Sequence, residues 1–467
     1  MPDKISRPNI LIFLLSLMLI LCLPAAPARQ AHPRDSSEQE GKAKKQPTSS
    51  HVVLLTISGL RSDFVTSAES HRQRIPTIQT LRSKGSYAVG IESVFPSQTI
   101  PSHATMLTGS LPADHGVTSD YSFDEKTAVQ SKEPYKSAKE IKTDTIFELA
   151  RRMNLVTAAV GFPLTSNATI KFNLPDDTSA GNEDSPARLL RNEILSALKS
   201  EPGAALKGER EKLSNYSKDF FNASAAAYII EKHRPNLLLI NFASFDAAQR
   251  RYGLLSEESL RSLELIDGLV KKIIDATERS RIAEGTTYII LSDSGAAKVE
   301  KEFNPNVVLA KKGWLTSDSQ GRIVSWQAAA QSFGGSAAIF VKDPQDEKFI
   351  RELEEFFHQQ AGKPDSPIWR VIPKRDVSKL GADPRAALYL DAAPSYAISP
   401  KTSGAPITKA ADRTARGYAP SRADMRAVFI ITGNGIKSGA LVEYARLFDV
   451  APTVARLLGL EMKTARG

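Results

Sequence analysis

The chain has 467 residues, a formal net charge of +9, and 41% hydrophobic and 24% charged residues. This length suits one large α/β domain with an insertion, or two domains, and the composition is that of an ordinary globular protein. The basic residues are dispersed, without a dense Lys/Arg block interleaved with aromatic residues, so the charge pattern speaks against nucleic acid as a partner.

The N-terminal segment has the order of charge and hydropathy of an export signal. Lys4 and Arg7 precede an apolar run over residues 10–23, and small residues follow it up to Ala28. This order predicts a secretory signal peptide over residues 1–28 and a protein exported to the periplasm or the extracellular space. An uncleaved signal is the one setting in which we expect a membrane contact, although 14 residues is short for a spanning helix.

Two further features near this end limit the chemistry of the protein. The only cysteine, Cys22, lies inside the apolar run, so the chain after the signal can form neither disulfides nor thiolate metal sites. Leu21 stands where a lipoprotein signal has a small residue, which speaks against lipidation. Residues 29–50 are polar, charged and poor in apolar side chains, and we interpret them as a flexible tether.

From residue 51 the sequence alternates apolar runs with helical patterns. Residues 52–57 form a β-branched run without polar alternation, which is typical of a strand buried on both faces. Pro76 begins a helical pattern over residues 76–84, and Gly85 follows its end. The later expected strands cover residues 156–160, 237–242, 287–291, 337–341 and 427–432, and the later expected helices cover residues 145–153, 186–200, 217–233, 256–280 and 448–458.

This alternation predicts an α/β fold with a mostly parallel sheet and helices on both of its faces. Residues 303–410 interrupt the pattern, so we expect them to form an inserted smaller lobe. The core of the fold then consists of residues 51–302 and 411–467. The sequence carries no signal for an oligomeric state.

The stretch around Thr99 is the first candidate for a functional site. Pro96 and Pro101 bracket a turn, and a helix-compatible run begins at Ser102. Pro101 lacks an N–H group that a helix start does not need, and Ser102 can cap the first turn. We therefore expect Thr99 just before a helix N-terminus, where unpaired N–H groups favour anions and a hydroxyl nucleophile can meet a phosphate.

Polar side chains also follow three of the expected buried strands closely. Ser58, Asp246 and Asp293 lie just beyond the runs that end at residues 57, 242 and 291. Ligands of open α/β sheets bind at the carboxyl ends of the strands. These three side chains and the Thr99 turn therefore form a constellation, which is more informative than any one of them.

A set of short motifs extends over most of the chain. In chain order they are Phe95-Pro-Ser-Gln-Thr-Ile-Pro-Ser-His-Ala-Thr, Thr108-Gly109 with His115-Gly116, Asp144-Thr-Ile-Phe-Glu-Leu-Ala, Leu291-Ser-Asp-Ser-Gly, Gly334-Gly-Ser-Ala-Ala and Asp424-Met-Arg-Ala. From about Val52 to Gly459 the sequence resembles the type I phosphodiesterase/nucleotide pyrophosphatase family, within the alkaline phosphatase superfamily. The resemblance implies an alkaline-phosphatase-like fold. It also implies hydrolysis of phosphate esters and diesters by a threonine or serine nucleophile between two divalent metals, usually zinc.

The resemblance assigns roles to four residues. Thr99 matches the nucleophile, and Asp246 and Asp293 match two carboxylate ligands of the metals. Ser102 stands where the family usually has an asparagine near the phosphate.

At four further ligand positions the chain departs from the family pattern. Ser58 replaces an aspartate, and Arg250 replaces the histidine four residues after the strand-end aspartate. Ser294 replaces the histidine of a Ser-Asp-His-Gly motif. Arg416, followed by Gly417-Tyr418, replaces the last histidine of a Gly-x-His-Gly-Tyr motif.

These departures leave few ligands for a metal. One catalytic zinc takes about three His, Asp or Glu ligands, and two take about six. The chain offers Thr99, Asp246 and Asp293, while His103 and His115 match family residues at positions that look structural. We therefore expect no metal cofactor and a catalytically impaired protein.

The two arginines allow two interpretations. In the first, Arg250 and Arg416 act with Ser102 as a clamp for the phosphate or sulfate group of a small molecule, because fixed guanidinium charge can replace a metal there. In the second, the arginines only pair with acidic neighbours, as Arg250 can with Asp246 four residues earlier on a helix turn.

Two other functions remain as alternatives. The first is a working zinc-dependent hydrolase with Thr99 as nucleophile, in which Asp63, Glu92 or Asp120 supplies the missing ligands. The second is a partner-binding envelope protein in which the catalytic cleft implied by the resemblance has no role.

Overall fold

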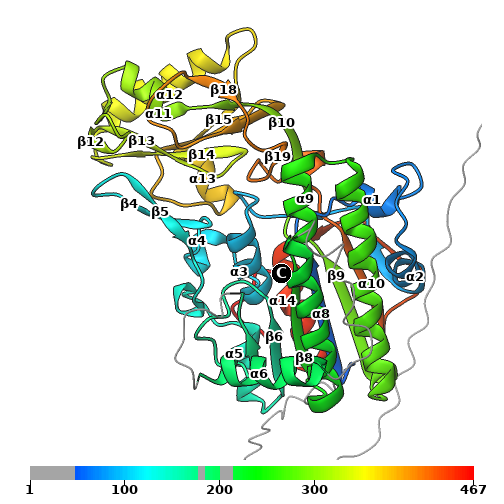
Figure 1. Cartoon of the computed structure of the whole chain (residues 1–467). Coiled ribbons are helices and arrows are strands. Elements are labelled where there is room, and N and C mark those ends of the chain that lie inside the picture. The colour runs from blue at the N-terminus through cyan, green and yellow to red at the C-terminus, as the bar shows by residue number, and fades with distance from the viewer. Residues whose placement is uncertain (1–47, 177–184, 200–213) are drawn as a thin grey trace, which may run out of the picture. The chain divides into compact units, whose positions relative to one another are not determined.

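Strand β1 (His51–Ile57) lies inside the largest sheet and is buried on both faces. Val53 and Leu55 pack into the apolar cluster on one side of the sheet, and Val52 and Leu54 pack into the cluster on the other. This two-sided burial explains why the strand is a continuous apolar run. The structure is a computed structural model that describes residues 48–176, 185–199 and 214–467 (Figure 1).

Within these residues the largest sheet has eight strands. In spatial order they are β21 (Leu441–Val442), β2 (Ser86–Ala88), β20 (Phe429–Gly433), β9 (Thr286–Leu291), β1, β8 (Leu237–Phe242), β6 (Thr157–Val160) and β7 (Phe172–Leu174). The strands from β9 to β7 run parallel to their neighbours. Strand β20 is antiparallel to both β9 and β2. The expected mostly parallel sheet is therefore confirmed, with a reversed strand towards one edge.

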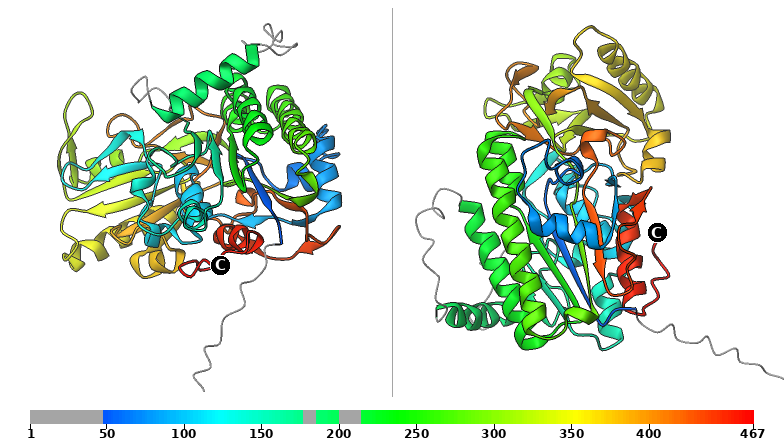
Figure 2. Two further views of the ribbon diagram at one scale, coloured as in Figure 1. Left: turned by 90° about the horizontal axis from the view of Figure 1, so that it is seen from below. Right: turned by 90° about the vertical axis from the view of Figure 1, so that its right-hand side faces the viewer.

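Helices cover both faces of this sheet. On one face lie α2 (Pro76–Lys84), α6 (Pro186–Lys199), α8 (Ser214–His233), α9 (Ser244–Tyr252) and α10 (Glu257–Arg279). On the other face lie α3 (Thr99–Thr108), α5 (Ile146–Arg152) and α14 (Val450–Leu457). In the right-hand view of Figure 2, the long green helices and the red helix α14 lie on opposite sides of the strands.

A second group of elements follows β9 and has its own apolar cluster. Its four-stranded antiparallel sheet has the order β13 (Ala328–Ser332), β14 (Ser336–Val341), β16 (Leu388–Ala392) and β15 (Ile368–Pro373). Around it lie β10 (Ala297–Phe303), α11 (Pro305–Lys311), β11 (Leu315–Ser317), β12 (Ile323–Trp326), α12 (Glu347–Ala361), α13 (Lys374–Val377), β17 (Ser395–Ile398), β18 (Ile407–Lys409) and β19 (Thr414–Ala415). The lobe boundaries at residues 303 and 410 stay a prediction, since β10 already begins at Ala297.

Short elements complete the fold. They are α1 (Asp63–Thr66), β3 (Ile91–Glu92), α4 (Pro112–His115), β4 (Tyr121–Asp124), β5 (Val129–Pro134) and β22 (Ala445–Arg446), with 3₁₀ turns at Ala138–Glu140, Ala283–Gly285, Ser378–Leu380, Ala423–Met425 and Leu447–Asp449. Each helix and strand expected by range from the sequence is present, with ends shifted by at most three residues.

The predicted signal peptide and most of the predicted tether fall on residues 1–47, which lie outside the described residues. Among the described helices, none combines the length and the apolar character that a membrane crossing requires.

Candidate functional site

The helix that carries Thr99 begins earlier than the sequence suggested. Helix α3 starts at Thr99 itself, after Gln98 in extended conformation, so the expected position of Thr99 before the helix is wrong by one turn. The expected cap at Ser102 is also wrong, because this residue lies inside the helix with its hydroxyl 3.1 Å from the Ser93 hydroxyl. A proline in the first turn of a helix is tolerated because the N–H groups there have no intrahelical partner, so Pro101 does not have to be the first residue.

At the end of β1, two hydroxyl groups donate hydrogen bonds to one side-chain amide of the neighbouring strand β8. The Ser58 hydroxyl donates to Asn241 Oδ1 at 3.2 Å, and the Thr56 hydroxyl donates to the same oxygen at 2.8 Å. Ser58 is buried and lines a cavity beside Thr99. A hydroxyl and a carboxamide therefore lie where the resemblance predicts a carboxylate.

Asp293, directly after β9, is the most deeply buried carboxylate of the site. Its Oδ1 accepts the backbone N–H groups of Gly59 at 3.1 Å and Ser294 at 2.9 Å. Its Oδ2 accepts a hydrogen bond of 2.6 Å from Arg416 Nη1. Burial raises the pKa of Asp293, but Arg416 together with the hydrogen bonds from Gly59 and Thr99 outweighs this effect and holds the pKa of the carboxyl below its ordinary value.

Arg416 also contacts the second retained carboxylate. Its Nε lies 3.2 Å from Asp246 Oδ1, and its side chain is only 15% exposed. One guanidinium group thus joins Asp246 and Asp293, the two positions that resemble metal ligands. Although burial opposes it, the charge of the two carboxylates raises the pKa of Arg416, so the group stays cationic.

Arg250 lies on the other side of Asp246. Its Nε is 3.2 Å from Asp246 Oδ2, four residues earlier on α9, and its side chain is 50% exposed. The simpler interpretation of Arg250, as a partner of Asp246 on one helix turn, is therefore correct for its Nε.

Glycines hold the main chain of Arg416 in place. Gly335 N–H donates to the Arg416 carbonyl at 2.6 Å, and Gly417 N–H donates to the Ser97 carbonyl in the Thr99 turn at 3.0 Å. Gly417 has a φ of +89°, and a Cβ there would collide with the Phe333 carbonyl. The turn between β13 and β14 therefore fixes the direction from which Arg416 enters the site.

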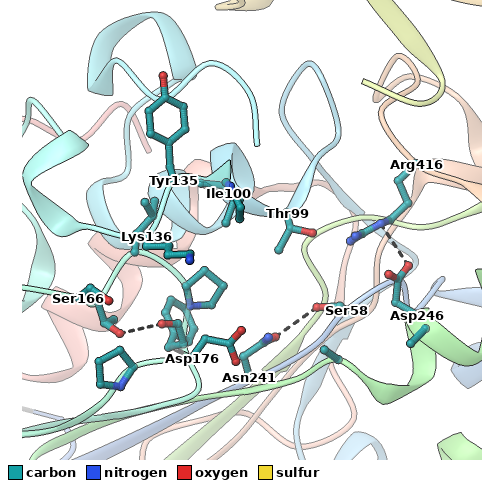
Figure 3. Close-up of a pocket in the computed structure, with 18 of the residues that line it drawn as sticks. Ser58, Thr99, Ile100, Tyr135, Lys136, Ser166, Asp176, Asn241, Asp246 and Arg416 are labelled. Carbon is teal, nitrogen blue, oxygen red and sulfur yellow. Dashed lines mark hydrogen bonds and ion pairs between the residues drawn. The ribbon is translucent and has the colours of Figure 1, made fainter. Parts of the chain in front are cut away.

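Thr99, Ser58, Asp246, Arg250 and Arg416 all line one cavity of about 270 Å³, which we call the first cavity. Figure 3 shows Thr99 facing the Arg416 guanidinium, with Ser58 and Asn241 below them. The rest of the wall is largely apolar and includes Ile100, Phe162, Pro163 and Leu164. The fold thus brings together five of the eight residues that the sequence singled out.

The other three lie behind this surface. Ser102, Ser294 and Asp293 are fully buried and do not line the cavity, although Asp293 contacts Arg416 and Thr99, which do. Within the described part of the chain, the Ser294 hydroxyl has no hydrogen-bond partner. The anion-binding role expected for Ser102 is therefore not supported by its position.

The two histidines that match family residues are buried. His103 Nδ1 lies 2.7 Å from the Thr99 carbonyl, and His115 Nε2 lies 3.1 Å from the Thr105 hydroxyl. Burial lowers the pKa of His103, and it lowers the pKa of His115 to about 3. Neutral side chains hydrogen-bonded inside and beside α3 agree with the structural positions expected for them.

Sequence reasoning missed Asn241, and it offered Asp120 only as a substitute metal ligand. Asn241 was detectable as the single polar residue in the apolar run 237–242. Asp120 gives no such signal: its carboxylate accepts the Ile100 N–H at 2.8 Å, next to Thr99, through a contact between distant segments. Loss of hydration raises the pKa of Asp120 to about 6.

The side chains present do not fit a two-zinc centre. A guanidinium group stands between the two carboxylates, and the other positions hold hydroxyls and a second guanidinium. The residues that the sequence offered as replacement metal ligands do not supply the missing ligands. Asp63 forms a bidentate pair with Arg61, and Glu92 contacts Tyr444 and Arg426. Across the described ranges, no group of three or more His, Cys, Asp or Glu residues is arranged to hold a metal ion.

Comparisons with known proteins agree with the motifs. A family model described as type I phosphodiesterase/nucleotide pyrophosphatase matches residues 52–419. Human ectonucleotide pyrophosphatase/phosphodiesterase family member 1 is 22% identical over 248 residues, which are 52% of this chain and 23% of that protein. An uncharacterized pyrophosphatase/phosphodiesterase of Schizosaccharomyces pombe is 20% identical over 406 residues, which are 83% of this chain and 72% of that protein. The chain thus spans about a quarter of the human relative's length.

Solved structures give the same fold. Human ectonucleotide pyrophosphatase/phosphodiesterase 5 aligns with a TM-score of 0.61 at 16% identity, over 88% of this chain and 95% of that chain. The murine counterpart, solved as an inactive variant in complex with AMP, aligns with a TM-score of 0.62 over 88% and 96%. From the family model, which covers most of the residues, we conclude that this chain belongs to the type I phosphodiesterase/nucleotide pyrophosphatase family.

Proposed function

We propose that this protein is a non-hydrolytic member of its family that binds a small oxyanion, with the Arg416 guanidinium in the place of the two divalent metals. The observation that carries the proposal is the contact of one guanidinium with both Asp246, at 3.2 Å, and Asp293, at 2.6 Å. A cation that belongs to the chain satisfies the two carboxylates, so they need no metal to balance their charge.

The chemistry of this arrangement argues against hydrolysis. A metal lowers the pKa of a nucleophile and stabilises charge on the attacking and leaving oxygens. The Arg416 guanidinium already donates a hydrogen bond to Asp293 and is paired with Asp246, so its charge is largely compensated and stabilises a transition state less than a metal does. Thr99 then has neither a metal nor a neighbouring histidine base at its hydroxyl, because His103 contacts its carbonyl oxygen instead.

The site keeps features that suit weak binding of a phosphate or sulfate group. Thr99 begins α3, and the positive end of a helix favours an anion. The half-exposed guanidinium of Arg250 lines the same cavity. We further propose that the protein acts after export, which the predicted signal peptide over residues 1–28 supports.

Zinc content and turnover measured on one purified sample test the proposal. We expect well under one zinc per chain, a melting temperature that chelator leaves unchanged, and background hydrolysis of chromogenic phosphate monoesters and diesters. Thr99→Ala should match the native protein in each assay. Two tightly held zinc ions, or turnover that Thr99→Ala abolishes, would contradict the proposal and favour the hydrolase alternative.

A further inference from the structure

The two arginines separate the first cavity from a neighbour. A second cavity, of about 290 Å³, is also lined by Arg250 and Arg416. The first cavity extends past Thr99 towards Phe162, whereas the second extends towards Phe333 and the segment around Thr414. A ligand at the arginines can therefore reach into both spaces.

The two guanidinium groups differ in how far the chain already engages them. Arg416 is 15% exposed and contacts both Asp246 and Asp293. Arg250 is 50% exposed, its Nε pairs with Asp246, and its side chain makes no hydrogen bond within the described residues. The terminal N–H groups of Arg250 are therefore the donors that a bound oxyanion can take.

The charges of the remaining wall differ between the cavities. Among the described residues that line the first cavity, the one carboxylate besides Asp246 is Asp176, which is paired with Lys218 at 2.5 Å, and Lys136 is paired with Glu133 at 3.0 Å. In the second cavity Asp120 and Asp412 form no ion pair within the described ranges. Its third carboxylate, Glu302, is paired with Lys401 at 2.7 Å. An anion therefore meets a more favourable potential in the first cavity, and a cation in the second.

Resting on the proposed function, we infer that Arg250, rather than Arg416, contacts the anionic group of the ligand. We further infer that this group lies in the first cavity. The ligand is then a small sulfate, sulfonate or phosphate whose substituent enters the second cavity and is cationic or neutral, because a second anionic group would face Asp120 and Asp412. Arg416 positions Asp246 and Asp293 and does not take part in recognition.

Titration calorimetry with inorganic sulfate at low salt tests the role of Arg250. We expect Arg250→Gln to weaken sulfate binding by about tenfold, because a charge-assisted hydrogen bond is lost, and Arg250→Lys to keep part of the affinity. Arg251→Gln is the matched control, since Arg251 is adjacent, exposed, stacked 5.2 Å from the Tyr252 ring and outside both cavities. It should bind sulfate as the native protein does.

The second cavity is tested with two small sulfonates on the native protein. We expect 2-aminoethanesulfonate to bind about tenfold more tightly than carboxymethanesulfonate, because only the ammonium group complements the unpaired carboxylates. Asp412→Asn should reduce this difference and leave the affinity for inorganic sulfate almost unchanged.

The outcomes separate this inference from the proposed function. Equal sulfate binding by native protein and Arg250→Gln, no sulfate binding by the native protein, or a preference for the carboxylated sulfonate would each overturn the inference. The absence of sulfate binding would also contradict the oxyanion binding of the proposed function, whereas the other two results would leave that function standing. Its non-hydrolytic part is tested separately, by bound zinc and by Thr99-dependent turnover.

Discussion

The Thr99 turn and the strand ends opposite it have kept the family pattern to different degrees. At the turn, Thr99 is still the first residue of α3 and still faces the cavity. At the strand ends, Arg416 stands between Asp246 and Asp293, and Ser58 occupies the position where the resemblance predicts a carboxylate. Under our proposal, the backbone frame is therefore retained in both regions, and the donor set has changed in only one.

This difference shows what the fold requires of the site. Asp293 is fully buried, and a buried carboxylate is costly unless a cation and hydrogen bonds satisfy it. In the family pattern a metal is that cation, and here Arg416 is. The turn carries no such requirement, because Thr99 is neutral. We therefore expect changes at the strand ends to affect stability far more than changes at the turn.

Removal of the Arg416 charge should give the largest effect. Arg416→Met keeps much of the side-chain volume but leaves Asp293 buried without a cation, so we expect the free energy of unfolding to fall by about 3–5 kcal/mol. Denaturant unfolding at neutral pH measures this. Arg250→Met removes the half-exposed ion pair with Asp246 and should lower the free energy of unfolding by about 1 kcal/mol or less. Equal losses in the two variants would contradict the contrast between the two arginines.

Substitution of Gly417, which follows Arg416 in the chain, should give the second-largest loss of stability. Gly417→Ala places a Cβ against the Phe333 carbonyl at a φ of +89°, so the segment has to shift or the residue remains strained. We expect a loss of about 2–3 kcal/mol, comparable to other strained backbone positions. Gly404→Ala is the control, because Gly404 has a φ of +94° but a Cβ added there would meet no atom within 4 Å. A similar small cost in both variants would show that the close approach at Gly417 has no role.

The contribution of Asp120 to the pH dependence of the free energy of unfolding should be smaller than either of these losses. Its pKa is raised to about 6 in the folded protein, so the folded state binds the proton more tightly than the unfolded chain does. Stability therefore falls as pH rises through the window from about 4, the value of an unperturbed Asp, to about 6. Asp120→Asn should remove this decline and be about 1 kcal/mol more stable than the native protein at pH 7.5, with partial solvation limiting the effect. Parallel unfolding curves of both proteins between pH 4 and 8 would rule this out.

Ser294→Ala should have the smallest effect. The Ser294 hydroxyl is buried and has no hydrogen-bond partner among the described residues, so its removal leaves no group unsatisfied. We expect the free energy of unfolding to change by less than about 0.5 kcal/mol, or to rise slightly. A loss above about 1 kcal/mol would reveal a contact that this hydroxyl makes.

Much of the fold was predictable because its signals are local. The two-sided burial of β1 appears as a continuous apolar run, and α2 is marked by Pro76 and Gly85. The start of α3 was not predictable from Pro101, because a proline is tolerated at several positions of a first turn.

The site likewise contains contacts that the sequence suggested and contacts that it did not. The pair of Asp246 and Arg250 follows from their spacing on α9, so sequence alone suggested it. The partners of Arg416 depend on a turn of another sheet that fixes its main chain, and no local pattern encodes this. The place of Asp120 beside Thr99 is likewise a tertiary contact.

The central claim, that Arg416 stands in the place of the metals, is tested most directly by rebuilding the ligand set with and without it. The four-fold variant Ser58→Asp, Arg250→His, Ser294→His and Arg416→His should bind zinc, because the strand ends still bring these positions together. The three-fold variant that keeps Arg416 should bind well under one zinc per chain, as the native protein should. Zinc per chain in the three folded proteins is the measurement. Equal zinc in the three-fold and four-fold variants, whether bound by both or by neither, would contradict the claim.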